Sequence, residues 1–378
     1  MTTTRAQVSG LALRDFRSFE HLELTTPDEG VVLVGENGAG KTNLLEAIQY
    51  LSLMRSARGA GDADVVRFGA DGFFVNARIC VGEAHEVSVG FERAGKRKRV
   101  RRDGVPTDRL SDALGAIPTV MFSPDDVSLV AGAPGARRRF LDIMLALSSR
   151  PYLHALQQYR GALERRNAAL RDAARPGRSG GAGIEAWEPA LSEHGAVLWR
   201  ARREWVARVA DTYARRCAAI GERASSQLRY QCGLDGSAAG SDERAALTEA
   251  LASRRANDIR HGVTGTGPHR DDLALLMDER DLRTFGSAGQ QRTAAITLRT
   301  LEADALRESR GAAPVFLLDD PFAELDSARA ERVLALLAEI GLGQTILAVP
   351  RDTDIPPGLT SLPRARVTLG SVVGEWAP

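Results

Sequence analysis

Cysteine is scarce in this 378-residue chain. Its three cysteines are far apart in the sequence and odd in number: Cys80, Cys217 and Cys232. That arrangement excludes a disulfide framework, and it offers no metal-ligand spacing. We therefore expect the three thiols to be small buried apolar groups.

Lysine is equally scarce, and it occurs only at Lys41, Lys96 and Lys98. Arginine supplies the remaining positive charge. Together with abundant alanine and glycine, this indicates a coding bias, so that arginine-rich stretches are weak evidence for a nucleic-acid site. The formal net charge of +1 gives no global signal for nucleic acid either.

Long apolar runs are absent from the sequence, and no segment reaches the length needed to cross a bilayer. The amino terminus, Met1-Thr2-Thr3-Thr4-Arg5, lacks the apolar core of a signal peptide. We therefore expect a cytoplasmic protein. With 43% hydrophobic and 26% charged residues, the composition is that of a globular protein, and the length favours more than one structural unit.

One glycine-rich segment carries the most information. It fills every constrained position of the pattern G-x-x-x-x-G-K-[ST] and consists of Gly35, Glu36, Asn37, Gly38, Ala39, Gly40, Lys41 and Thr42. In this pattern glycines turn backbone N–H groups toward phosphates, the lysine reaches the β and γ oxygens, and the threonine hydroxyl reaches Mg²⁺. The segment predicts a site for a nucleoside triphosphate.

Both flanks of this segment support the prediction. A β-branched run, Val31–Val34, precedes it, and Leu44, Ile48 and Leu51 follow with the spacing of one helix face. A strand, a loop and a helix are therefore expected, with the positive end of the helix dipole at the phosphates.

Three regions of different character follow one another along the chain. Residues 1–125 alternate like strands and contain the glycine-rich segment, residues 126–260 show long amphipathic helical patterns, and strands and short helices resume over 261–378. This predicts an ATPase head in two parts, interrupted by an inserted helical arm. Within the arm, the glycine-rich stretch Pro176–Gly183 predicts a flexible connection between two helices.

Two features of these regions have two interpretations each. The basic stretch Lys96–Val105 predicts a hairpin, whose charges either blunt a solvated edge strand or contact DNA phosphates. The candidate DNA contacts are Arg97, Arg99 and Arg101 of this stretch and the cluster Arg137–Arg139. The tryptophans Trp187, Trp199 and Trp205 either pack within the arm or stack on bases, and packing is favoured. His269 is expected at a hydrogen-bonded structural corner.

An acidic pair, Asp319-Asp320, follows the apolar run Val315–Leu318. Ligands bind at the carboxyl ends of parallel strands, where this run would deliver the pair. In phosphate-loop enzymes the first carboxylate holds Mg²⁺, and the second orients or deprotonates the attacking water. We therefore expect Thr42 and Asp319 at the metal, and Lys41, Asp319 and Asp320 as catalytic residues.

A second anion-binding device is expected at Ser287–Gln291, where small residues lead into a helix. We name this stretch the signature segment. Because the glycine-rich segment already provides one phosphate cradle, two such devices on one chain suggest that each faces a nucleotide in a different subunit.

The complete set of motifs resembles ABC-type ATPases. The signature segment is similar to their signature motif, Asp319-Asp320 to their second acidic motif, and Glu324-Leu325-Asp326 to their D-loop. Further matches in order and spacing make the chain similar to the RecF family, at Gly35–Ile48, Phe122–Asp126, Arg137–Asp142, Gly267–Asp272 and Leu317–Asp326. The resemblance implies an α/β, ABC-type head with a mixed sheet, in which two heads sandwich two ATP molecules.

The resemblance also implies site residues and partners. It places Ser287, Gly289, Gln290 and Asp326 at the nucleotide, with Ser287 also catalytic. It implies a homodimer that forms with ATP and Mg²⁺, clamps DNA near single-strand gaps or junctions, and helps load recombinase with RecR and RecO. A transporter ATPase subunit and a small-molecule kinase are the alternatives, and the signature segment disfavours the kinase.

Several positions depart from the family pattern. Ala288 replaces a usual glutamine, which should be tolerated because Ser287 and backbone N–H groups make the contacts. Asp320 replaces the glutamate of fast ABC enzymes, and we predict slow, DNA-stimulated hydrolysis because the shorter carboxylate reaches water less well. Ala348-Val349-Pro350 stands where relatives carry a γ-phosphate sensor, so that this residue and the Q-loop glutamine stay unassigned.

Overall fold

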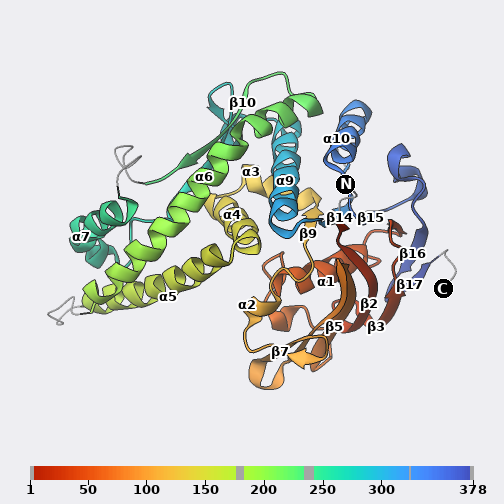
Figure 1. Cartoon of the computed structure of the whole chain (residues 1–378), viewed down its shortest axis with the longest axis horizontal. Coiled ribbons are helices and arrows are strands. Elements are labelled where there is room, and N and C mark those ends of the chain that lie inside the picture. The colour runs from red at the N-terminus through yellow and green to blue at the C-terminus, as the bar shows by residue number, and fades with distance from the viewer. Residues whose placement is uncertain (1–3, 176–182, 234–241, 323–324, 375–378) are drawn as a thin grey trace. The chain divides into compact units, whose positions relative to one another are not determined.

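The computed structural model describes residues 4–175, 183–233, 242–322 and 325–374 (Figure 1). The chain folds as two compact units. Unit 1 comprises Met1–Asp126, Ala219–Gly221 and Ala295–Pro378, and unit 2 comprises Val127–Ala218 and Glu222–Ala294. Most of the predicted connection at Pro176–Gly183, and Glu324 of the D-loop, lie outside the described residues. The predicted assignment of residues 1–125 and 261–378 to an ATPase head, and of residues 126–260 to an inserted arm, stays a prediction.

A mixed six-stranded sheet in unit 1 has the order β17-β16-β4-β15-β14-β9. Its strands are β4 (Gly30–Val34), β9 (Thr119–Phe122), β14 (Val315–Asp319), β15 (Thr345–Val349), β16 (Arg364–Thr368) and β17 (Ser371–Gly374). Neighbouring strands are parallel, except that β17 returns antiparallel to β16. The central strands consist of buried apolar residues, as parallel strands covered on both faces require. The carboxyl ends of β4, β9, β14 and β15 therefore meet at one edge.

An antiparallel sheet of the same unit has the order β3-β2-β5-β6-β7-β8. Its strands are β2 (Gln7–Phe16), β3 (Phe19–Thr25), β5 (Gly72–Val81), β6 (Glu83–Glu92), β7 (Arg97–Arg102) and β8 (Val105–Pro106). These strands confirm the alternation seen in the sequence, including the basic hairpin. The short strands β1 (Thr4–Arg5) and β13 (Ala312–Ala313) pair separately in parallel.

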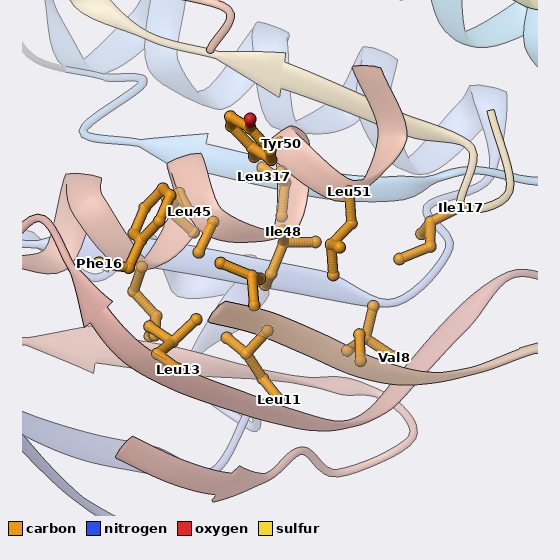
Figure 2. Packing of buried hydrophobic residues seen from close by; sticks show 14 of the residues in the cluster. Val8, Leu11, Leu13, Phe16, Leu45, Ile48, Tyr50, Leu51, Ile117 and Leu317 are labelled. Atoms are coloured by element: carbon orange, nitrogen blue, oxygen red, sulfur yellow. The ribbon is translucent and has the colours of Figure 1, made fainter. Parts of the chain in front are cut away.

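Helix α1 (Lys41–Leu53) lies in the apolar core between these sheets. Figure 2 shows Leu45, Ile48 and Leu51 of α1 with Leu11 of β2 and Leu317 of β14 in one cluster. Because both faces of α1 are covered, its position is fixed by packing along its whole length. The remaining helices of unit 1 are α2 (Leu110–Ala113), α10 (Ser327–Ile340) and the larger part of α9 (Ala288–Arg310).

Unit 2 is mainly helical. Its helices are α3 (Ser128–Ala131), α4 (Pro134–Ser148), α5 (Arg150–Ala173), α6 (Glu188–Ile220, whose end belongs to unit 1), α7 (Glu243–His261), α8 (Leu282–Phe285) and the first turns of α9. Arg166 of α5 bonds Glu188 at the start of α6, and Arg202, further along α6, bonds Tyr152 near the start of α5. The two helices are therefore antiparallel, which confirms the predicted helical hairpin.

Two tryptophans of this hairpin are part of its packing. The indole N–H of Trp199 donates to Asp271 Oδ2 over 2.6 Å, and Trp205 is buried against Phe140. This confirms the packing interpretation for these two rings. Across the described residues, each helix is too short or too polar to span a membrane.

One strand of unit 2 was not expected. β10 (Ser226–Gln231) pairs antiparallel with β11 (Asp272–Met277), which also pairs with β12 (Arg280–Asp281). The sequence predicted long helices and few strands over residues 126–260. Strand β10 has the polar sequence Ser-Gln-Leu-Arg-Tyr-Gln, and only Ser226 and Leu228 are buried. It therefore lacks the apolar alternation by which a strand is predicted from sequence.

Candidate nucleotide-binding site

The glycine-rich segment connects β4 to α1 at the edge where the parallel strands end. Gly38 and Gly40 have φ angles of 85° and 109°, in the left-handed region that favours glycine. Gly40 immediately precedes α1, and a Cβ there would lie 2.9 Å from Ser18 Oγ. The segment therefore needs glycine at Gly40 for both conformation and space, and it presents the N-terminus of a buried helix to the edge of the sheet.

Lys41 is the first residue of α1 and is 8% exposed. Its ammonium donates to the carbonyl oxygens of Gly35 and Glu36, at 2.5 and 2.9 Å. Burial lowers the pKa of Lys41, and the charges of Asp319 and Asp320 act in the opposite direction. The lysine is thus folded over its own loop, close to two carboxylates.

Thr42 meets the acidic pair directly. Its hydroxyl lies 2.9 Å from Oδ2 and 3.1 Å from Oδ1 of Asp319, which ends β14. Burial raises the pKa of the Asp319 carboxyl, whereas the hydrogen bond from Thr42 and the charge of Lys41 lower it. A hydroxyl beside a partly buried carboxylate is a set of hard oxygen donors that fits Mg²⁺.

Asp320 has a φ angle of 44°, and its N–H donates to the Ala348 carbonyl over 2.9 Å. This bond ties the acidic pair to β15. Asparagine and aspartate are the non-glycine residues that adopt the left-handed region most readily, which explains why an aspartate is tolerated here.

These residues enclose a cavity of about 310 Å³, near the lower limit for ligand pockets. Its lining is Asn37, Gly38, Gly40, Lys41, Thr42, Asn43, Pro124, Asp319, Asp320 and Pro350. The structure thus brings together the glycine-rich segment and the acidic pair. Pro350 has no N–H and no polar side chain, so that it offers no hydrogen-bond donor to the cavity.

Sequence reasoning missed the turn between β2 and β3 as a support of the loop. Ser18 Oγ accepts a hydrogen bond from Asn43 Nδ2 over 3.0 Å. The preceding Arg17 forms a bidentate ion pair with buried Glu46 of α1, at 2.8 and 3.0 Å. A positive φ of 54° at Arg17 aims its side chain, a conformation that no sequence pattern revealed.

Ion pairs and hydrogen bonds also stabilise the turn that carries Pro124 into the cavity lining. Asp126 caps the turn by accepting from the Ser123 N–H over 2.9 Å, and its other oxygen accepts from Arg299 at 2.6 Å. Arg299 also donates to Glu302 of α9 over 2.7 Å. This network accounts for the acidic residue in the segment Phe122–Asp126.

The signature segment lies in unit 2, at the start of α9. Ser287 Oγ accepts from the Gln290 N–H over 3.3 Å, and the Ser287 N–H donates to Gln290 Oε1 over 3.0 Å, a reciprocal capping box. Gln291 Nε2 donates to the Leu282 carbonyl. Ser287 is exposed, and the segment, which includes Gly289, forms an accessible, hydrogen-bonded helix start.

Asp326 caps a different helix. Its carboxylate accepts from the Arg329 N–H over 2.8 Å at the start of α10, and its side chain is exposed. Among the described residues of unit 1, Asp326 is not part of the cavity lining. Its predicted contact with nucleotide stays a prediction.

The arginines considered for DNA differ in accessibility. Arg97, Arg99 and Arg101 lie on one exposed face of β7. Arg137, by contrast, is buried, pairs with both oxygens of Asp272 at 2.8 Å and donates to carbonyls of the α3 region. Because these bonds occupy the guanidinium, its candidacy as a DNA contact is wrong, and Arg137 is a structural residue.

His269 forms the predicted structural corner. One ring nitrogen lies 3.0 Å from the Thr264 carbonyl, so that nitrogen carries the hydrogen, and the other accepts from the Tyr159 hydroxyl at 2.6 Å. Burial lowers the pKa of His269 to about 4. The ring is therefore neutral and holds the loop before β11 against α5.

Comparison with known proteins identifies the family. The family model described as "RecF/RecN/SMC N terminal domain" matches residues 7–351. The DNA replication and repair protein RecF of Frankia alni is 36% identical over 374 residues, which cover 96% of this chain and 98% of that protein. The chain belongs to the RecF family. RecF of Lacticaseibacillus paracasei is 34% identical over 328 residues, covering 86% of this chain and 88% of that protein.

A solved RecF structure shares the fold along the whole chain. The structure of "the recombination mediator protein RecF-ATP in RecFOR pathway" has a TM-score of 0.89 and 26% identity, and it covers 99% of each chain. This likeness confirms the predicted ABC-type α/β head. Membership of the RecF family favours a DNA replication and repair protein over a transporter ATPase subunit or a small-molecule kinase.

Proposed function

We propose that this protein is an ATP-dependent DNA-binding recombination mediator that acts as an ABC-type ATPase. The observation that carries this proposal is the cavity at the edge of the parallel sheet, where Lys41, Thr42 and Asp319 converge at the start of a buried helix. A RecF relative of the same fold is described with ATP.

ATP would bind with its phosphates over the glycine-rich segment. Lys41 would exchange two backbone carbonyls for phosphate oxygens, which are stronger acceptors because they are charged. Thr42 and Asp319 would hold Mg²⁺, which commonly takes one or two protein oxygens and completes its shell with phosphates and water. The metal would neutralise charge on the phosphates. Asp320 would orient or deprotonate the attacking water.

A second copy of the chain would complete the site. The exposed start of α9 offers backbone N–H groups and the Ser287 hydroxyl to an anion. We propose that Ser287, Gly289 and Gln290 face the nucleotide of the partner, with Asp326 close by, so that ATP joins two heads. Hydrolysis would be slow, DNA-stimulated and would release the dimer.

DNA would be held mainly through its phosphates. Arg97, Arg99 and Arg101 form a row of exposed cations on β7. The ion pairs of Arg97 and Arg99 with Glu92 are solvent-exposed and therefore weak. We propose that this row contacts duplex or junction DNA near single-strand gaps. Because RecF relatives belong to the RecFOR pathway, RecO and RecR are the proposed partners in loading recombinase.

Titration of fluorescent ATP tests the nucleotide site. Wild-type protein is expected to bind ATP with Mg²⁺, and Lys41→Arg to weaken binding by tenfold or more, since the planar guanidinium does not fit the lysine position. Lys96→Arg is the matched control, because Lys96 is exposed and away from the cavity lining. Equal ATP affinity of wild type and Lys41→Arg would contradict the proposed site.

A further inference from the structure

The two faces of β7 have different surroundings. Arg97, Arg99 and Arg101 are exposed, whereas Lys98 and Val100 lie on the side of the core. The Lys98 side chain is only 11% exposed, compared with 64% for Arg97 and 60% for Arg99. Of the two lysines of the basic hairpin, Lys96 is exposed to solvent and Lys98 points toward the core.

The Lys98 ammonium is bound by groups near the end of α1. It lies 3.1 and 3.2 Å from the carboxylate oxygens of Asp62, which belongs to η1 (Asp62–Asp64), and it donates to the Met54 carbonyl. It also sits over the Tyr50 ring, 4.7 Å from the centroid, and the Tyr50 hydroxyl donates to Asp62 over 2.6 Å. Three groups, the Asp62 carboxylate, the Met54 carbonyl and the Tyr50 ring, thus surround one largely buried charge.

Met54 makes this contact specific to the end of α1. It follows the last residue of the helix and has a φ angle of 53°, so that it closes the helix C-terminus. Carbonyls at a helix C-terminus lack intrahelical donors and carry the negative end of the dipole, which favours a cation there. The Lys98 ammonium therefore fixes β7 to the C-terminal end of α1.

The opposite end of α1 is the phosphate-binding end. The helix has 13 residues from Lys41 to Leu53, which spans roughly 20 Å. Tyr50, Ile48 and Leu45 are buried along it, and Figure 2 shows them in the shared core with β2. A packed helix of this kind moves as one body, so that a shift at Met54 is felt at Lys41.

We infer that Lys98 is a positioning residue that couples DNA contact on β7 to ATP binding at the start of α1. The inference rests on the proposed function, since it assigns a regulatory link between its two sites. The Glu92 carboxylate lies 3.2 Å from Arg97 and 3.8 Å from Arg99. DNA phosphates that pair with these two arginines compete with Glu92, and this competition shifts the position of β7. Because the Lys98 ammonium is bound to the Met54 carbonyl and to Asp62, a shift of β7 displaces the C-terminal end of α1.

Linkage requires this coupling to be reciprocal, so that DNA changes ATP affinity by the same factor by which ATP changes DNA affinity. The experiment measures the ATP affinity of the full chain with and without a saturating gapped duplex. Wild type should show a ratio of about fivefold or more. In Lys98→Met, which keeps the apolar stem and loses the ammonium, the ratio should fall to about one, with each separate affinity within about twofold of wild type.

Lys96→Met is the matched control, because it removes one exposed charge from the same hairpin and leaves the contact with α1 intact. It should retain the wild-type ratio. Asp62→Asn, which keeps the size of the partner side chain, should lower the ratio as Lys98→Met does. Asp62→Asn also decides the matter if Lys98→Met does not fold.

Three results would overturn the inference. The first is a wild-type ratio in Lys98→Met or, where that protein does not fold, in Asp62→Asn. The second is an equal loss in both separate affinities, which indicates general destabilisation. The third is a ratio of one in wild type that binds both ligands, which leaves the proposed function intact. Wild type that binds no ATP or no DNA would instead contradict the proposed function itself.

Discussion

The hydroxyl of Thr42 lies 2.9 Å from Oδ2 of Asp319, although 277 residues separate the two in sequence. The contact joins the first turn of α1 to the carboxyl end of β14. It exists because β4 and β14 flank β15 as parallel strands of one sheet, and the carboxyl ends of these three strands meet at the same edge. Two short motifs thereby become one site.

The first prediction concerns Asp320. Asp320→Asn should reduce ATP turnover by about 10²- to 10⁴-fold, because the amide cannot accept a proton from water. ATP binding and folding should be retained, since asparagine tolerates the φ angle of 44°. Steady-state phosphate release measures the effect, with exposed Asp125→Asn as a control. Unchanged turnover in Asp320→Asn would place the base elsewhere.

The second prediction concerns the buried pair of Arg137 and Asp272. Arg137→Ala should lower the free energy of unfolding by about 3 kcal/mol, because it leaves a carboxylate and several carbonyls without their donor. The double variant Arg137→Ala, Asp272→Ala should lose less than the sum of the single variants. Urea unfolding measures all three. Additive losses would show that the pair is not coupled.

The third prediction concerns the pH dependence of stability. The pKa of His269 is about 4 in the folded protein and near 6.5 in the unfolded chain, so the unfolded chain binds more protons between these values. The stability due to the neutral ring is complete above pH 6.5 and is lost as pH falls toward 4, by at most about 3 kcal/mol. Urea unfolding between pH 7 and 4.5 should show a shallower loss for His269→Gln. An identical pH profile in both proteins would contradict this role.

The fourth prediction concerns the arginine row on β7. Replacement of Arg97, Arg99 and Arg101 by glutamine should weaken DNA binding and reduce the slope of log affinity against log salt by about 3, close to one for each lost phosphate contact. Replacement of Arg244, Arg254 and Arg260 on α7, all exposed, is the control of equal charge. A slope that falls equally in the control, or that stays unchanged in the β7 variant, would show that the DNA surface lies elsewhere.

The fold was largely predictable because its signals are local. Val31–Val34 and Val315–Leu318 are apolar runs of strand length, and both form buried parallel strands. Ile296, Leu298 and Leu301 keep helical spacing and are buried on α9. Strand β10 escaped prediction because its partner, β11, lies more than 40 residues away and supplies the hydrogen bonds that its polar sequence does not advertise.

The residues that line the candidate site were predictable where they belong to short contiguous motifs. Lys41, Thr42, Asp319 and Asp320 follow from residue type and spacing. Arg17, Ser18 and Lys98 do not, because a left-handed φ, a turn contact or a buried ammonium depends on tertiary packing. Arg137 was misread for the same reason, since its charge suggested DNA and its burial was invisible in the sequence.

We propose that ATP joins two copies of this chain through Ser287. Sedimentation velocity with Mg²⁺, ATP and gapped duplex measures this association on wild type, Lys41→Arg and Ser287→Arg. Wild type is expected to dimerise, Lys41→Arg to stay monomeric because it binds ATP poorly, and Ser287→Arg to stay monomeric although it binds ATP as wild type does. Normal ATP-dependent dimerisation of Ser287→Arg would rule out a role of Ser287 in joining the two copies.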